Sequence, residues 1–203
     1  EWEWIDDSPL RRVLKPKEPR GRVRFLSDDE RKILLVSCKQ NKAQYLYPLV
    51  VLALSTGARR GELLGLTWGD IDLKRKVAIL HKTKNEERRA LPLAGHALDC
   101  VEKLAEIRRI DTNLLFPDET GKKPVEIRPA WERVLKESKI EDFKFHDLRH
   151  SAASYLAMSG ASLAEIAEVL GHKTLQMVKR YSHLSEQHTA NVVSRMNERI
   201  FGG

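Results

Sequence analysis

The residues best suited to chemistry lie in the last third of the chain and combine imidazoles, a guanidinium and a phenol. His146 and Arg149 stand three residues apart in the run Phe145-His-Asp-Leu-Arg-His150, so in a helix their side chains share one face. Such a pair can bind two oxygens of one phosphate, although a solvated basic face would show the same spacing. Tyr181, nine residues after His172, offers a phenol that could be a nucleophile or a half-buried packing residue.

Two further cationic segments lie upstream. The run from Thr56 to Trp68 places Arg59 and Arg60 at a predicted helix junction, where backbone N–H groups without helical partners could also bind a phosphate. Helix capping combined with surface charge would account for the same residues. Lys82 and Lys84 lie in a polar stretch between two predicted strands. Together these segments favour a reaction on an anion.

Motifs that depend on a nucleotide or a metal ion are missing from the sequence. There is no G-x-x-x-x-G-K-[ST] phosphate loop, no G-x-G-x-x-G and no H-E-x-x-H. Asp28, Asp29 and Glu30 are contiguous, but they fall in the first turn of a predicted helix, where the helix dipole favours acids. The sequence therefore predicts chemistry without cofactor or metal.

The composition favours a polyanionic partner. The 203 residues include 36 Lys plus Arg against 29 Asp plus Glu, for a formal charge of +7, which points to nucleic acid before an anionic membrane surface. Cys38 and Cys100 lack the paired spacing of a disulfide framework or zinc site, so a reducing, cytoplasmic setting is expected. The longest apolar run, residues 45–55, covers about half of the ~20 residues that a membrane span needs.

The elements that must position these residues are mainly helical. Ser27 and Glu30 form a capping box that begins a helix, in which Ile33, Leu34 and Leu35 are expected to face inward. A second, centrally buried helix is predicted over residues 45–55.

Later segments complete a mainly α fold with a small antiparallel β-sheet. Residues 77–80 and 90–93 read as two short strands joined by a loop. Helices are predicted over 145–159 and 162–170, and a final short helix should hold Tyr181.

The segments above follow one order along the chain: Thr56-Gly-Ala-Arg59 with Glu62, Thr83-Lys84 followed by Leu91-Pro92-Leu93, His146-Asp-Leu-Arg149-His150, Leu170-Gly-His172, and Tyr181-Ser-His183. This order closely resembles the tyrosine recombinase (phage integrase) family, from about Phe25 to Leu184. The resemblance implies a basic interdomain linker over residues 1–24, a catalytic domain over 25–185 and a tail over 186–203. It also implies an N-terminal DNA-binding domain before Glu1.

By this resemblance, the catalytic residues are Arg59, Lys84, His146, Arg149, His172 and Tyr181. Arg59 and Arg149 would neutralise charge on the non-bridging phosphate oxygens, which guanidinium groups do well because they bind as a fork. Tyr181 would attack the phosphate and form a 3′-phosphotyrosine. His146 is the expected base, because a phenol with a pKa of about 10 is mostly protonated at neutral pH.

The resemblance gives the remaining residues supporting roles. Lys84 is the expected acid that protonates the leaving 5′ oxygen, although Lys82 lies two residues earlier on the same side of a strand and could substitute. His172 would donate a hydrogen bond to the phosphate. Glu62 would orient Arg59 without itself contacting the phosphate. His150 is expected to turn away from His146 and to make a buried structural hydrogen bond.

The activity implied is site-specific DNA recombination, as in integration or excision of a phage or mobile element. The expected partners are double-stranded DNA, other protomers in a tetramer formed by exchange of the tail, and accessory DNA-bending or directionality proteins. The tail could equally fold back on its own domain. No membrane association is expected.

Two alternatives use part of the same evidence. Residues 162–180 resemble a helix-turn-helix, in which a second, polar helix enters the major groove and Tyr181 only packs or touches a phosphate. That interpretation leaves Arg59, Lys84 and the His146–Arg149 pair unexplained. A type IB topoisomerase would use nearly the same chemistry to relax DNA, although its sequences match these spacings less well.

Overall fold

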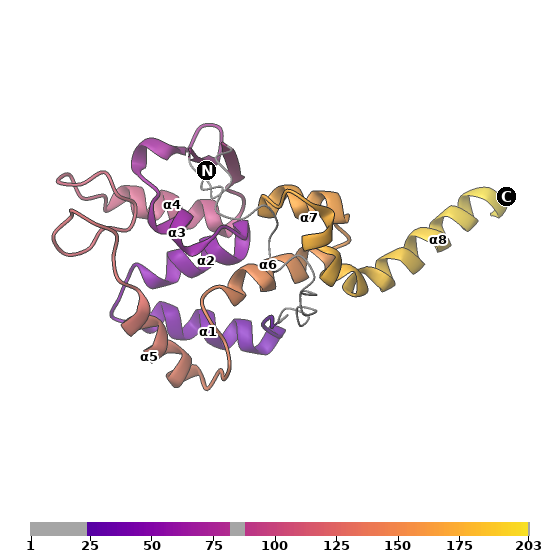
Figure 1. The fold of residues 1–203 in the computed structure, drawn as a ribbon, viewed down its shortest axis with the longest axis horizontal. Coiled ribbons are helices and arrows are strands. Elements are labelled where there is room, and N and C mark those ends of the chain that lie inside the picture. The colour runs from indigo at the N-terminus through magenta and orange to yellow at the C-terminus, as the bar shows by residue number, and fades with distance from the viewer. Residues whose placement is uncertain (1–23, 82–87, 203) are drawn as a thin grey trace, which may run out of the picture.

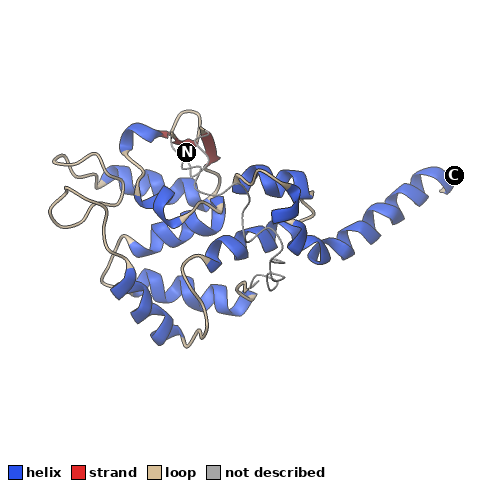
Figure 2. Ribbon diagram, viewed as in Figure 1, coloured by secondary structure: helices blue, strands red, loops and turns tan. Residues whose placement is uncertain are grey.

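The computed structural model describes residues 24–81 and 88–202. Helices dominate this part of the chain, with one small three-stranded antiparallel sheet (Figure 2). The predicted fold class is therefore confirmed. The expected linker over residues 1–24 lies outside the described residues except for Arg24, and so do Lys82 and Lys84.

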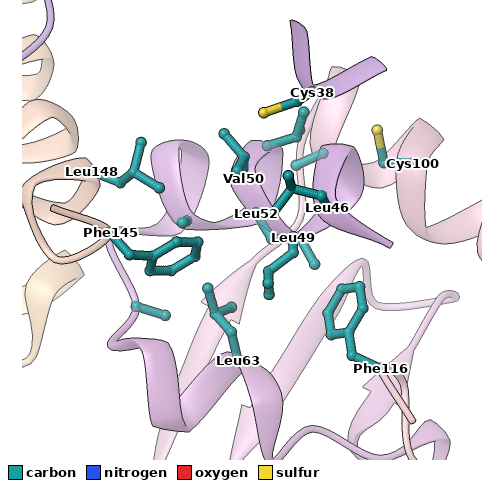
Figure 3. Close-up of a cluster of buried hydrophobic side chains, with 14 of the residues drawn as sticks. Cys38, Leu46, Leu49, Val50, Leu52, Leu63, Cys100, Phe116, Phe145 and Leu148 are labelled. Carbon is teal, nitrogen blue, oxygen red and sulfur yellow. The ribbon is translucent and has the colours of Figure 1, made fainter. Parts of the chain in front are cut away.

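Helix α2 (Leu46–Thr56) is the centre of the hydrophobic core. Its sequence is apolar nearly all round, which is typical of a helix surrounded by others, and α1 (Asp28–Gln40), α4 (His96–Glu106) and α6 (Asp147–Met158) all pack against it. Figure 3 shows α2 side chains between residues of these neighbours, with labels on Leu46, Leu49, Val50 and Leu52.

Helix α1 begins at the predicted capping box. The Glu30 N–H donates to Ser27 Oγ, and the Glu30 carboxylate accepts from the Ser27 N–H. Leu34 is fully buried and Leu35 packs on the core, but Ile33 is 48% exposed. The inward prediction is wrong for Ile33, because neighbouring helical positions point about 100° apart and cannot all face one core.

The sheet confirms the predicted strand pair and adds a third strand. β2 (Val77–Leu80) pairs antiparallel with β3 (Arg89–Pro92), and β1 (Ile71–Asp72) pairs with the other edge of β2. β1 has only two residues, too few to show the alternation by which a strand is recognised. The register places Leu80 opposite Arg89.

Two helices complete the larger part of the domain. The short helix α3 (Arg60–Leu64) follows directly on the turn after α2, and α5 (Arg128–Ser138) packs against α1. Pro129 lies in the first turn of α5, where its missing N–H has no helical partner to lose.

The last third of the domain forms a second, smaller hydrophobic cluster. Helix α7 (Leu163–Leu170) begins at a capping box of Ser162 and Glu165 and ends at Gly171, whose φ is +63°. Two short 3₁₀ segments follow, η2 (Leu175–Met177) and η3 (Lys179–Ser185). η3 carries Tyr181 and packs against α6. The polar α-helix required by the helix-turn-helix interpretation is not formed here.

Helix α8 (Glu186–Phe201) projects from the body of the domain rather than folding back on it (Figure 1). One set of its side chains, which we name the apolar stripe, is between 43% and 60% exposed: Val192, Val193, Met196 and Ile200. Among the described residues, none of the helices combines the length and apolar character needed to cross a lipid bilayer.

Candidate active site

Arg149 is the most deeply buried cation of the site. Its side chain projects from α6 and donates from Nη1 to the Gly57 carbonyl (2.6 Å) and from Nη2 to the Leu170 carbonyl (2.7 Å). The residue is only 5% exposed. Burial, followed by the charges of Arg59 and Arg89, lowers its pKa to about 10, so it stays protonated at neutral pH. These two carbonyls use two of the five N–H groups that a guanidinium carries.

Arg59 makes two hydrogen bonds to the Glu62 carboxylate. Arg59 Nη1 donates to Glu62 Oε1 (2.7 Å), and the Arg59 backbone N–H donates to Oε2 (2.8 Å). The Glu62 side chain is 6% exposed and that of Arg59 is 24% exposed. The neighbouring Arg60 is exposed. Glu62 therefore fixes the direction of the Arg59 guanidinium while leaving part of it open to solvent.

Arg89, which the sequence analysis missed, is a third guanidinium in the same place. Its Nη2 donates to Glu62 Oε2 (2.9 Å) and its Nη1 to the Val169 carbonyl (2.8 Å). It stands at the start of β3 after a highly charged stretch, so its sequence context is that of an exposed loop residue. The period of two along a strand was the available signal, because Arg89 lies on the same side of β3 as Leu91, which is 1% exposed.

Tyr181 lies inside the smaller hydrophobic cluster, and its hydroxyl is hydrogen-bonded to a histidine. Tyr181 Oη is 2.5 Å from His150 Nδ1, and Tyr181 is 2% exposed. Burial raises the pKa of the phenol, against the opposing charges of Arg180 and Arg149. The residue was expected on a short helix, and η3 is that helix.

The two histidines of α6 face each other, which corrects one prediction. The rings of His146 and His150 are 5.5 Å apart and nearly perpendicular, because positions four residues apart share a helix face. The expectation that His150 turns away from His146 is therefore wrong. Burial and then the charge of His146 lower the pKa of His150 to about 4. Burial and then Arg149 also lower the pKa of His146.

His172 follows the turn at Gly171 and lines an open cavity of about 470 Å³ together with Arg59 and Arg89. Its Nδ1 is buried without a hydrogen-bond partner among the described residues. Burial, followed by Arg149 and Arg59, lowers its pKa to about 4. The structure thus places a histidine ring beside two guanidinium groups at the wall of this cavity.

The structure brings together five of the six residues expected to be catalytic, and Lys84 lies outside the described residues. The matching family is established by comparison with known proteins. Residues 24–188 match the model of the phage integrase family. The chain belongs to this family. The resemblance inferred from the motifs is thereby confirmed.

Individual members of the family show the same relationship. The chain is 33% identical to the integrase of Salmonella phage P22, in a match that covers 100% of the chain and 54% of that protein. It is 35% identical to the shufflon-specific DNA recombinase of Escherichia coli, covering 91% of the chain and 46% of that protein. The chain thus spans about half the length of these curated relatives.

Solved structures of integrases share the fold. The catalytic domain of bacteriophage HP1 integrase superposes with a TM-score of 0.66 at 26% identity, covering 85% of this chain and 95% of that one. The Tn1549 transposon integrase in complex with transposon right end DNA gives a TM-score of 0.73 at 19% identity, over 89% of this chain and 68% of that one. This integrase-family chain therefore has the fold of a catalytic domain.

The histidines of this integrase domain give a testable dependence of stability on pH. His150 and His172 both have a folded-state pKa of about 4, below the value of about 6.5 expected in the unfolded chain. The unfolded state therefore binds more protons once the pH falls below about 6.5, and the free energy of unfolding should decrease from there down to about pH 4. Urea unfolding at about pH 7 and about pH 5 measures this decrease.

Matched substitutions identify the responsible groups. His150→Gln and His172→Gln should each reduce the loss of stability between the two pH values, because glutamine does not titrate. His183→Gln replaces an exposed histidine and should leave the wild-type dependence intact. Equal unfolding free energies for the wild type at both pH values would contradict the prediction.

Proposed function

We propose that this chain performs site-specific DNA recombination, cutting and rejoining DNA through a covalent bond between Tyr181 and a backbone phosphate. The observation that carries the proposal is the Tyr181 phenol, hydrogen-bonded to His150 (2.5 Å) beside a cluster of buried guanidinium groups. A nucleophile next to a proton acceptor and an anion-binding site is the arrangement that attack on a phosphodiester requires.

The charge of the site fits a phosphodiester. Arg59 and Arg89 both pair with the Glu62 carboxylate, and the charge of Arg149 acts on the same group, so positive charge is in excess. Burial away from water makes that excess costly until an anion enters. The free N–H groups of Arg59 and Arg149 would bind the non-bridging oxygens, and their attraction strengthens as negative charge grows in the transition state. His172 would add a hydrogen bond from its ring.

The proton of Tyr181 needs an acceptor, and His150 is the immediate candidate. The sequence analysis assigned this role to His146, but it is His150 that holds the hydrogen bond to the phenol. We assign the proton to His150, with the His146 ring in edge-to-face contact with it. Without DNA the low pKa of His150 makes it a weak base. A bound phosphodiester anion would raise that pKa and ease the transfer.

The complete step balances without an external energy source. Tyr181 Oη bonds to phosphorus, the bond from phosphorus to the 5′ oxygen breaks, and the leaving oxygen takes a proton from Lys84, with Lys82 as the alternative donor. The 3′-phosphotyrosine conserves the energy of the broken ester. Attack by a 5′ hydroxyl from another strand then reverses the step and joins new partners.

The proposed partner is double-stranded DNA, in agreement with the solved Tn1549 integrase complex with transposon right end DNA. The net positive charge of +7 should make binding steeply dependent on salt. We further propose that protomers assemble as a tetramer on DNA and act in the cytoplasm, with accessory DNA-bending or directionality proteins. The natural task would be integration or excision of a phage or mobile element.

The test is direct trapping of the covalent intermediate. A pool of random duplexes carrying nicks, from which the short strand diffuses away after cleavage, is incubated with the protein in EDTA. Digestion of the adduct and mass spectrometry should locate a nucleotide on Tyr181. An adduct on another residue, or intact DNA binding without any adduct, would overturn the proposal.

The apolar stripe of α8 gives a prediction for assembly. Replacing its four residues with serine should lower the number of protomers per DNA. The substitutions remove the exposed apolar surface that a neighbouring protomer would cover. Native mass spectrometry on a cognate duplex measures the stoichiometry. Single-site cleavage should persist while exchange between two sites falls. The control variant replaces Arg195 and Glu198, which are exposed on the same helix, with serine. It should keep the wild-type stoichiometry. An unchanged number of protomers per DNA in both variants would refute docking through the stripe.

A further inference from the structure

We propose that Arg89 is a positioning residue that fixes Arg59 and the turn before His172 in one arrangement. This inference rests on the proposed DNA cleavage and assigns a role to a residue outside the predicted catalytic set. Arg89 would act through the groups that it holds and would not itself contact the scissile phosphate.

The two ends of the Arg89 guanidinium connect segments that are far apart in the sequence. Nη2 reaches Glu62 at the start of α3, 27 residues away, and Nη1 reaches the Val169 carbonyl at the end of α7, 80 residues away. Only a forked group with several donors can make both bonds in one plane. β3, α3 and α7 are thereby fixed relative to one another.

Glu62 passes this constraint to Arg59. One carboxylate oxygen accepts from the Arg59 side chain, while the other accepts from both the Arg59 backbone and Arg89. Without Arg89, the carboxylate could rotate about its last torsion angle, and the Arg59 guanidinium would turn with it. A displacement of a few tenths of an ångström in a phosphate-binding group is enough to weaken transition-state binding.

The same side chain also supports the turn that carries His172. A Cβ atom added at Gly171 would lie 2.7 Å from Arg89 Nη1 and 3.0 Å from Cζ, so the backbone of the turn rests directly on the guanidinium. Glycine is required there for two reasons, the positive φ and this contact. The position of the backbone that carries His172 therefore depends on Arg89.

The electrostatic cost of Arg89 supports a role in directing charge. The side chain is 12% exposed, and burial, together with the neighbouring charge of Arg59, lowers its pKa while Glu62 opposes the change. A link that served the fold alone could be made from apolar side chains without this cost. A further buried cation beside Arg149 and the partly exposed Arg59 instead suits a site built around an anion.

The experiment compares Arg89→Ala and Arg89→Lys with the wild type in single-turnover cleavage of a trapped substrate at saturating protein. Arg89→Ala should lower the cleavage rate constant about 10- to 100-fold, the usual effect of losing a group that orients a ligating side chain, with little change in DNA affinity. Arg89→Lys keeps the charge but can make one of the two bonds, so its rate should be intermediate. Arg133→Ala, an exposed arginine on α5, is the control with the wild-type rate.

A second substrate separates positioning from simple loss of structure. In a methylphosphonate duplex the scissile group is uncharged, so less negative charge must be stabilised. The defect of Arg89→Ala should therefore shrink on this substrate, as should that of Arg59→Ala. Equal losses on both substrates, or a loss in DNA affinity alone, would overturn the inference. If Arg89→Ala fails to fold, the cleavage rate constants of Arg89→Lys on the two substrates are compared instead.

The outcomes also separate this inference from the proposed function. A wild-type protein that forms no adduct removes the proposed function and the role of Arg89 with it. A wild-type protein that cleaves while Arg89→Ala cleaves equally fast leaves the function intact and removes only the role of Arg89.

Discussion

Tyr181→Phe is expected to abolish the covalent protein–DNA adduct while leaving DNA binding nearly unchanged. The substitution removes only the attacking oxygen, and loss of a nucleophile lowers turnover by on the order of 10⁴-fold or more. It also removes the hydrogen bond to His150, so the free energy of unfolding should fall by about 1 kcal/mol. Adduct yield on a denaturing gel and a gel-shift titration measure the two quantities.

Tyr155→Phe is the matched control. Tyr155 on α6 also has a bonded hydroxyl, which donates to the Leu26 carbonyl (2.9 Å), but it belongs to the opposite side of the helix from the site. Its loss should reduce stability by a similar amount and leave the adduct intact. An adduct that persists in Tyr181→Phe would show that a different residue attacks.

Arg59→Ala has the second largest expected effect. Loss of one donor to the developing charge lowers a rate by on the order of 10²- to 10³-fold, and Glu62 would be left with one fewer partner. Arg60→Ala, one position along and exposed, should cleave at the wild-type rate. Single-turnover rate constants at saturating protein compare the two. A larger loss in Arg60→Ala would mean that the other arginine of the pair binds the phosphate.

The sequence predicted those parts of the fold that depend on local pattern. The capping box at Ser27 and the pairing of the strands were both correct, because each depends on residues close together in the chain. β1 was missed, since its two residues carry no periodicity of their own. Ile33 was misplaced, since a run of three apolar residues does not say which of them faces the core.

The site could be predicted only as a set of residue types in a known order. Arg59, Arg149 and Tyr181 are candidates because family motifs mark them. Arg89 has no such mark, and its proposed role rests on its contacts with Glu62 and Val169, 27 and 80 residues away. The contact between His146 and His150 follows from helix geometry alone, because positions four residues apart share a helix face. Contacts of this range depend on how α3, β3, α6 and α7 pack, which local pattern does not encode.

The arginines at the site also join the two hydrophobic clusters of the domain. Arg149 bonds the Gly57 carbonyl beside the larger cluster and the Leu170 carbonyl of the smaller one, and Leu170 packs so closely on Gly57 that a Cβ there would meet its Cδ2. The fold and the proposed cleavage therefore depend on the same few atoms. If the smaller cluster detaches from the larger, the proposed phosphate-binding site is dismantled and Tyr181 leaves with it, so a partly unfolded protein would lose the proposed means of cutting DNA.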